Sequence, residues 1–355
     1  MIATLMPVSA RSDSSLPPPR NMQRLTASVL IASYRRPESL ARCLRALGSQ
    51  DLAPGEVLVI WQAADESTRQ TVEELSKGFP FPLRAIHSPQ AGIVPAENAG
   101  LAQATGDVVL LTDDDAIPPP DWVAKHLKHY VDPSVGAVGS PIRNFDSDTA
   151  PRPFRTAARI GVITWYGKFI GNMFDHPEGW STRRPITVQH LAGVNMSLRR
   201  SALLRFEESL KPYWSMFEAE ACLQVQANRY RVLYDFSNTV RHFPTNSQTI
   251  YSDDRTGDLA VKVLNRAFNH AFILAKHSPW RLQIPRLLFI FCAGSRMTPG
   301  LLGWALASMR FGHPSREFGI LLKTWRSRLD GWTSGLKARS RPCVVGRRPP
   351  LQPIS

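Results

Sequence analysis

The chain has 355 residues, of which 43% are hydrophobic and 20% charged, and its formal net charge at pH 7 is +14. These values are ordinary for a globular protein with an ample core. The four scattered cysteines argue against a zinc site and a disulfide framework, and they fit a reducing cytosol. We expect no signal peptide and no membrane-spanning helix, because no apolar run is long enough for either.

The positive charge is concentrated at the two ends of the chain. Residues 276–355 carry 14 Lys and Arg against 2 Asp and Glu, a net charge of +12. Residues 1–24 add +2, so the total of +14 leaves residues 25–275 neutral. Such basicity can serve an anionic membrane surface, nucleic acid or a solubilising tail.

The first part of the chain alternates between strand-like and helical patterns. Apolar runs predict strands at 27–31, 57–60, 83–86, 108–111 and 136–138. Between them, Pro37 opens a helical pattern, Asp65 caps a helix over 66–77, and further helices are expected at 96–104 and 121–130. Strands that alternate with helices predict βαβ units and a parallel sheet, which is an α/β fold of the nucleotide-binding type.

The remaining sequence is less regular and then becomes helical. We expect loops or a lid over 143–190, a helix over 218–229, and strands at 232–234 and 239–242. Beyond residue 255 the pattern is helical, with two apolar stretches, 284–294 and 300–309, that could lie in a membrane interface. The predicted organisation is a disordered segment 1–24, an α/β domain 25–255, a helical, partly apolar region 256–336 and a disordered basic tail 337–355.

The most informative segment is the apolar run 108–111, which ends in Asp113, Asp114 and Asp115. Ligands of open α/β sheets bind beyond the carboxyl ends of the strands, so these acids should face a cleft. Asp113 and Asp115 can point the same way from an extended backbone, while Asp114 points away. Hard oxygen donors suit Mg²⁺ or Mn²⁺. The alternative is a solvated acidic turn before the proline run 118–120.

Several motifs together resemble the inverting glycosyltransferases of family 2, which have the GT-A fold. The resemblance covers roughly 26–245 and depends on the order and spacing of five segments: Ser28–Pro37, Asn98–Leu101, Asp113–Asp115, Gly193–Ser197 and Glu218–Glu220. The chain departs from the family at Trp61, where an Asp usually pairs with the base, at Glu97, where an Arg is frequent, and at Phe217, where a Glu is usual. Asp65 is an alternative to the missing Asp. These departures concern the identity of the nucleobase more than the reaction.

The resemblance implies a role for each matching residue. Asp115 is expected to ligate the metal, with Asp113 sharing it or lying nearer the ribose, and His242 is a further ligand or simply a packed histidine. Glu218 is the expected general base and Glu220 the reserve, although both could be ordinary acids of a helix's first turn. The expected nucleotide-sugar contacts are Ser33, Tyr34, Asp65, Asn98, Asp113 and Asp114, and Asn195 is expected to contact the acceptor or the sugar.

The leading hypothesis is a glycosyltransferase for cell-surface or exported glycans that uses Mn²⁺ or Mg²⁺. Its donor would be a nucleotide sugar, most simply a UDP-sugar, and its acceptor a glycan or a lipid-linked glycan. The basic, partly apolar region after residue 276 predicts peripheral attachment to the inner face of the cytoplasmic membrane. The alternatives are a nucleotide-sugar-binding protein without turnover and a basic nucleic-acid-binding protein. The latter is disfavoured because the α/β core is neutral.

Overall fold

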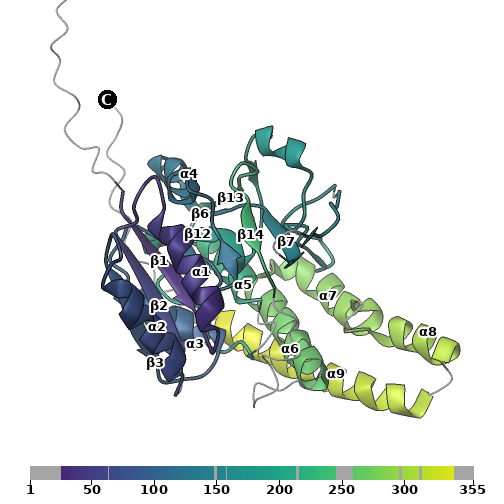
Figure 1. The fold of residues 1–355 in the computed structure, drawn as a ribbon. Helices are drawn as coiled ribbons and strands as arrows, with labels where there is room; N and C mark the ends of the chain where they lie inside the picture. Colours follow the sequence, from purple (N-terminus) through teal and green to yellow (C-terminus); the bar gives the residue numbers. More distant parts are fainter. Residues whose placement is uncertain are drawn as a thin grey trace, which may run out of the picture.

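The computed structural model describes residues 25–62, 64–147, 150–156, 158–212, 216–244, 259–295, 298–311 and 314–339. Its centre is a mixed eight-stranded sheet (Figure 1). The strands are β1 (Ala27–Ala32), β2 (Glu56–Gln62), β3 (Leu83–Ser88), β4 (Val108–Leu111), β6 (Val135–Gly139), β11 (Ile186–Thr187), β12 (Met196–Arg199) and β13 (Arg231–Tyr234). Their order is β11-β13-β6-β12-β4-β1-β2-β3. Only β11 and β12 run antiparallel to their neighbours, so the expected parallel α/β sheet is confirmed.

Helices cover both faces of this sheet because its strands bury side chains on both sides. The helices are α1 (Pro37–Gly48), α2 (Glu66–Ser76), α3 (Ile93–Gln103), α4 (Trp122–Leu127) and α5 (Phe217–Ala227). Alternation along β1 sends Val29 and Ile31 into one core with the leucines of α1, and Leu30 into the other core with α3 and α5. As the sequence predicts, Pro37 opens α1, and Asp65 caps α2 by accepting a hydrogen bond from the Thr68 amide.

A second, smaller sheet carries one wall of the site. It consists of β5 (Ala116–Ile117), β7 (Ile142–Ser147), β8 (Ala150–Pro151) and β14 (Val240–His242), in the order β5-β14-β7-β8. The region expected to form loops or a lid also contains the hairpin of β9 (Val162–Ile163) and β10 (Phe169–Ile170). These strands are too short to give a period-2 pattern, which is why the sequence shows only irregular composition there.

The C-terminal region is helical, as expected. It contains α6 (Leu259–His277), α7 (Trp280–Leu288), a π-helical turn (Phe289–Ala293), α8 (Leu301–Phe311) and α9 (Pro314–Arg339). In Figure 1, α9 returns alongside α6, while α7 and α8 extend outward from the sheet. Gly331 and Gly335 permit the close packing of α9 on α6, because a Cβ at either position would collide with the α6 backbone.

The sequence predicts disorder at both ends of the chain, over 1–24 and 337–355. Residues 337–339 belong instead to α9, which continues to Arg339 and buries Ala338 against α6. Residues 1–24 and 340–355, the rest of these two segments, lie outside the described residues. Within the described residues, no helix combines the length and the apolar character needed to cross a membrane.

Candidate active site

A cavity of about 760 Å³ opens at the carboxyl ends of β1, β2 and β4. This is where the strand-end acids were expected to meet a cleft. The residues that line it come from distant parts of the chain and include Ser33, Tyr34, Arg36, Gln62, Glu97, Asp113, Asp114, Gly193, Val194, Glu218 and Arg266. The cavity therefore brings together Ser33, Tyr34, two of the acids and Glu218, all of which were expected at the site.

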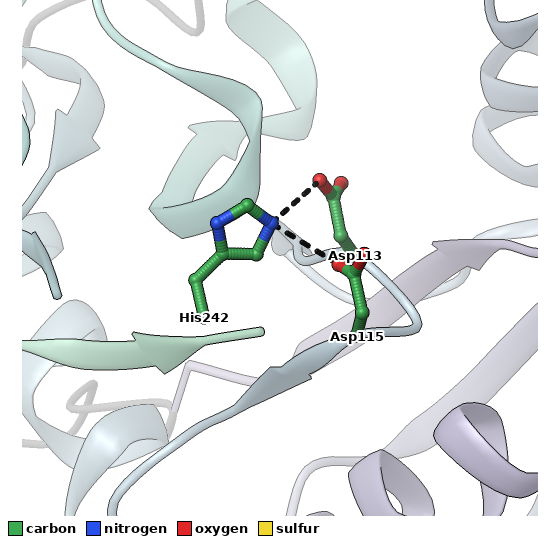
Figure 2. A group of neighbouring side chains, drawn as sticks. All are labelled: Asp113, Asp115 and His242. Atoms are coloured by element: carbon green, nitrogen blue, oxygen red, sulfur yellow. Dashed lines mark ion pairs between the residues drawn. The ribbon is translucent and has the colours of Figure 1, made fainter. Parts of the chain in front are cut away.

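Asp113, Asp115 and His242 face one another across the edge of the cavity (Figure 2). Nε2 of His242 lies 3.1 Å from Asp115 Oδ1 and 3.9 Å from Asp113 Oδ2. The other ring nitrogen, Nδ1, lies 2.8 Å from Oδ1 of Asn144. Because an amide oxygen can only accept, we assign a ring proton to Nδ1, so that Nε2, which faces the acids, pairs with Asp115 when it is protonated and can ligate a metal when it is not. This is the arrangement in which histidine ligates a metal.

The charges of this group are only partly balanced by the protein. Burial alone would raise the pKa of Asp115, but contact with His242 and the charge of Arg36 hold that pKa below its usual value. Burial alone would lower the pKa of His242, but Asp115 raises it. Oδ1 of Asp115 is buried, and none of the described residues gives it a hydrogen bond of good geometry. The donor set of two carboxylates, one imidazole and one unsatisfied buried oxygen fits a divalent cation.

The third acid, Asp114, has partners of its own. The backbone is not extended here, contrary to the prediction from the sequence, but turns, and the Ala116 amide donates to the Asp113 carbonyl at 3.1 Å. The carboxylate of Asp114 accepts a hydrogen bond from Ser33 Oγ at 2.7 Å and from Arg36 at 3.0 Å. Arg36 also donates to Asp115 Oδ2 at 2.8 Å. One guanidinium thus joins two adjacent acids, and Asp114 fixes the end of β1 against the end of β4. Tyr34 lines the cavity beside Ser33.

Glu218 lies in the first turn of α5 and lines the same cavity as Asp113. The amide of Gly193 lies 3.4 Å from its Oε1, and a side chain at Gly193 would press against the Glu218 carboxyl. Burial raises the pKa of Glu218, and the charge of Arg266 from α6 counteracts only part of that rise. A carboxylate with a raised pKa at the edge of a cavity has the properties of a general base.

Glu220, the reserve candidate for the base, points away from the cavity. It is fully buried and accepts hydrogen bonds from Gln224, from Lys276 at 2.7 Å and from His277 at 2.8 Å. Burial would raise its pKa, but His277 and Lys276 lower that pKa to about 2. A fully buried carboxylate that is engaged by Gln224, Lys276 and His277 is out of reach of an acceptor hydroxyl. Glu220 therefore links α5 to α6, and we no longer consider it a candidate base.

Two of the expected nucleotide-sugar contacts have structural partners instead. Asp65 is buried, and its carboxylate accepts hydrogen bonds from Ser67, Thr68 and the amide of Arg35. Asn98 exchanges hydrogen bonds with the backbone of Phe206 and so ties α3 to the loop before α5. Neither residue lines the cavity. The partners of Asp65 are mostly close in the sequence, as its role as a helix cap implies, whereas the partner of Asn98 lies 108 residues away and could not be found from a local pattern.

Asn195, expected to contact the acceptor or the sugar, is buried beneath the cavity floor. Its amide nitrogen donates to two backbone carbonyls, and its oxygen lies within hydrogen-bond distance of Trp122 Nε1 and His126 Nε2. All four hydrogen-bonding positions of the amide are therefore used inside the protein. The neighbouring Gly193 and Val194 line the cavity in its place.

A family model described as glycosyl transferase family 2 matches residues 28–204, about half of the chain. The matched segment includes β4, the three acids that follow it and most of the residues that line the cavity. The chain belongs to glycosyl transferase family 2. The succinoglycan biosynthesis protein ExoM of Rhizobium meliloti is 34% identical over 137 residues, which cover 38% of this chain and 44% of that protein. The chain thus matches less than half of the length of this relative.

Two solved structures show that the fold is of the GT-A type. The mannosyltransferase PcManGT of Pyrobaculum calidifontis, in complex with GDP-Man and Mn²⁺, has a TM-score of 0.50 at 15% identity. That match covers 89% of this chain and 88% of the other. S. aureus TarS 1-349, in complex with UDP-GlcNAc, has a TM-score of 0.51 at 17% identity, over 88% of this chain and 91% of the other.

Two cavity residues were not expected from the sequence. Glu97 replaces the family's frequent Arg; it is only 4% exposed, and the described residues offer its Oε2 no hydrogen bond. Burial, with the charges of Asp113 and Glu218, raises its pKa to about 8. Arg266 reaches the cavity from α6, beyond the matched segment. The departure at Glu97 was a signal in the sequence, whereas nothing in the sequence pointed to Arg266.

Proposed function

We propose that this family 2 member is an inverting, metal-dependent glycosyltransferase. It would move a sugar from a nucleotide sugar to an acceptor hydroxyl in the synthesis of a cell-surface or exported glycan. The observation that carries this proposal is that Glu218 faces the same cavity as Asp113 and the adjoining Asp115–His242 pair. The involvement of ExoM in succinoglycan biosynthesis, given by its name, supports the glycan context.

Asp113, Asp115 and His242 would hold the divalent cation, Mn²⁺ or Mg²⁺. When bound, such an ion neutralises the charge that develops on a diphosphate leaving group. The chain itself prepares the site: Asn144 turns Nε2 of His242 toward the acids, and Arg36 fixes the second oxygen of Asp115. The Mn²⁺ in the complex of PcManGT is consistent with this assignment.

Glu218 would act as the general base that removes the proton from the acceptor hydroxyl. Its raised pKa makes it a stronger base than an exposed glutamate. From its place in the same cavity as Asp113, Glu218 would activate the acceptor hydroxyl for attack on the face opposite the leaving group, which inverts the anomeric centre. Ser33 and Tyr34, at the end of β1, would contact the nucleotide.

We propose that the donor is a UDP-sugar. The family usually has an Asp that pairs with the nucleobase at the position of Trp61, and in this chain Trp61 is followed by Gln62. TarS was solved with UDP-GlcNAc and PcManGT with GDP-Man, so the fold accommodates both kinds of nucleotide. The test is a panel of UDP- and GDP-sugars, with release of nucleoside diphosphate measured in Mn²⁺ and after exhaustive EDTA dialysis. We expect turnover of a UDP-sugar only with the metal. Binding of donors without any turnover would favour the alternative of a non-catalytic nucleotide-sugar-binding protein.

We also propose that the C-terminal helices attach the protein to the cytoplasmic surface of an anionic membrane. Trp280, Ile284 and Leu288 recur every four residues along one face of α7 and are 70%, 70% and 57% exposed. Leu302 and Leu306 of α8 are 61% and 65% exposed. These exposed apolar residues lie within the region 276–355, whose net charge is +12. Apolar and basic side chains on the same helices suit the interface of an anionic bilayer.

Flotation with liposomes tests this attachment. The intact protein should float with vesicles that contain anionic lipid, and salt should weaken the association. Replacing Trp280 and Ile284 with Ser should reduce flotation, whereas replacing Phe154, an exposed aromatic residue away from these helices, should not. Equal flotation with neutral and anionic vesicles, or none at low salt, would contradict the proposed attachment.

A further inference from the structure

A second cavity, of about 430 Å³, lies beside the catalytic cleft. The segment around Phe174 separates the two: Met173 and Phe174 line the cleft, whereas His176 and Pro177 line the second cavity. The other walls come from β7, from the turn around Trp180 and from the segment between β13 and β14. No role at the proposed reaction centre uses any residue of this cavity.

Aromatic rings in this cavity hold arginines by stacking. The guanidinium carbon of Arg143 lies 3.9 Å from the centre of the Phe154 ring, and that of Arg241 lies 4.7 Å from the Phe145 ring. At the rim, Arg183 stacks on Trp180 at 3.6 Å. Stacking occupies the face of a guanidinium and leaves its N–H groups, which lie in its plane, able to bind an oxyanion. The ring contact thus orients the guanidinium of Arg143 without removing its charge.

Arg143 has an unused donor in this cavity. One of its terminal nitrogens is buried and has no hydrogen-bond partner among the described residues. The nearest carboxylate in an ion pair with it is Asp175, at 3.8 Å, which is beyond hydrogen-bond distance. Asp175 already accepts from the backbone amide and the side-chain amide of Asn144. Of the charged residues that line the cavity, Arg143 and Arg241 are basic and Glu178 is acidic, so the lining has a net charge of +1, and Arg143 keeps one donor that a ligand could satisfy.

His176 provides an acceptor in the same cavity. Its Nε2 lies 3.0 Å from the Tyr234 hydroxyl, which itself donates to the Met173 carbonyl. Nε2 must therefore carry the proton and donate to the hydroxyl, and Nδ1 is left as an acceptor. Nδ1 is buried and has no hydrogen-bond partner within the described part of the chain. Burial, together with the charge of Arg183, lowers the pKa of His176, which keeps the ring neutral.

We propose that this cavity binds an acidic sugar unit, a carboxylate-bearing pyranose of the acceptor glycan, beyond the sugar that reacts. Arg143 and Arg241 would bind the carboxylate, His176 Nδ1 would accept a hydrogen bond from a ring hydroxyl, and the aromatic walls would pack against the apolar face of the sugar. This inference rests on the proposed glycosyl transfer for the identity of its ligand as a glycan. The binding site itself exists independently of turnover.

The test uses tetragalacturonate and its methyl ester as probes, because they share one backbone and differ in charge. Binding to the full-length protein is measured by isothermal titration calorimetry in EDTA without donor, and donor turnover is measured separately on the same preparation. We expect the acid to bind about 10-fold or more tightly than the ester. Arg143→Gln should weaken binding of the acid about 10-fold and leave the weak binding of the ester unchanged.

Two further variants make the outcome interpretable. Arg152→Gln is the matched control, because Arg152 pairs with Asp146 on the neighbouring β-ladder and does not line the cavity. Arg241→Gln repeats the test at an exposed position if Arg143→Gln does not fold. Equal binding of acid and ester, or loss with Arg152→Gln but not with Arg143→Gln or Arg241→Gln, would overturn the proposal. Absence of donor turnover with these binding results intact would overturn the proposed function instead.

Discussion

Exchanging the carboxylate for an amide at two neighbouring positions of α5 should separate stability from catalysis. Glu220 is fully buried between α5 and α6 and is paired with Lys276 and His277. Glu218 lines the cavity of about 760 Å³ that we propose as the active site. Glu220→Gln leaves two basic groups without their anion. Glu218→Gln removes a carboxylate whose charge burial disfavours.

The pKa of Glu220 gives the size of the expected effect. The folded protein lowers it from 4.5 to about 2, mainly because the hydrogen bonds and charges of His277 and Lys276 outweigh burial. This difference in pKa between the unfolded and the folded protein corresponds to about 3 kcal/mol of stability. Because the folded pKa is the lower one, this contribution is complete above pH 4.5 and is lost as the pH falls toward 2. Breaking a buried ion pair typically costs about 3–5 kcal/mol, which agrees.

Urea unfolding at pH 7, followed by tryptophan fluorescence, measures the stability of each variant. Donor turnover per folded molecule measures its catalysis. Glu220→Gln should lower the free energy of unfolding by about 3 kcal/mol and retain most of its turnover. Glu218→Gln should keep its stability within about 0.5 kcal/mol and lose about 10²–10⁴-fold in kcat. The difference between the two variants should shrink when unfolding is repeated near pH 3.

The reverse pattern would refute this reasoning. If Glu220→Gln abolished turnover while its unfolding curve stayed unchanged, Glu220 would be the base, and its contacts with Lys276 and His277 would have to open during the reaction. If both variants were destabilised equally and both were active, neither residue would be the base.

Three further outcomes are expected. Turnover should fall on the acidic side at a pH above 4.5, because the pKa of Glu218 is raised above that value and only its ionised form accepts a proton; a pH profile of kcat that is flat down to pH 4 would contradict this. Asp115→Asn should reduce Mn²⁺ affinity about 100-fold or more, measured by calorimetry, and unchanged affinity would remove Asp115 from the metal site. Asn195→Ala leaves three buried partners without a hydrogen bond, because the Pro141 carbonyl still accepts from the Val240 amide, and should destabilise the protein by about 3 kcal/mol, seen in urea unfolding, with turnover per folded molecule retained.

The sequence by itself determined the features that arise from neighbouring residues. The apolar run of β4 and the three acids that follow it predict both a buried strand and its exit into a cleft. The extended backbone expected at the acids is wrong, because residues 113–116 form a turn closed by a hydrogen bond from the Ala116 amide to the Asp113 carbonyl, yet Asp113 and Asp115 still lie together beside His242. Asp65 caps α2 through a contact only three residues away.

Tertiary structure decided which of the candidate side chains reach the cleft. Glu218 and Glu220 are two residues apart, so their side chains point about 200° apart around the helix, and the packing of α5 on α6 determines which one is buried. Asn195 is satisfied by groups from distant segments, which its sequence neighbours could not reveal. His242 meets Asp115 only because β14 pairs with β5. Such pairings join residues more than 100 positions apart, and no local pattern encodes them, because the free energy that selects them comes from burying the whole sheet.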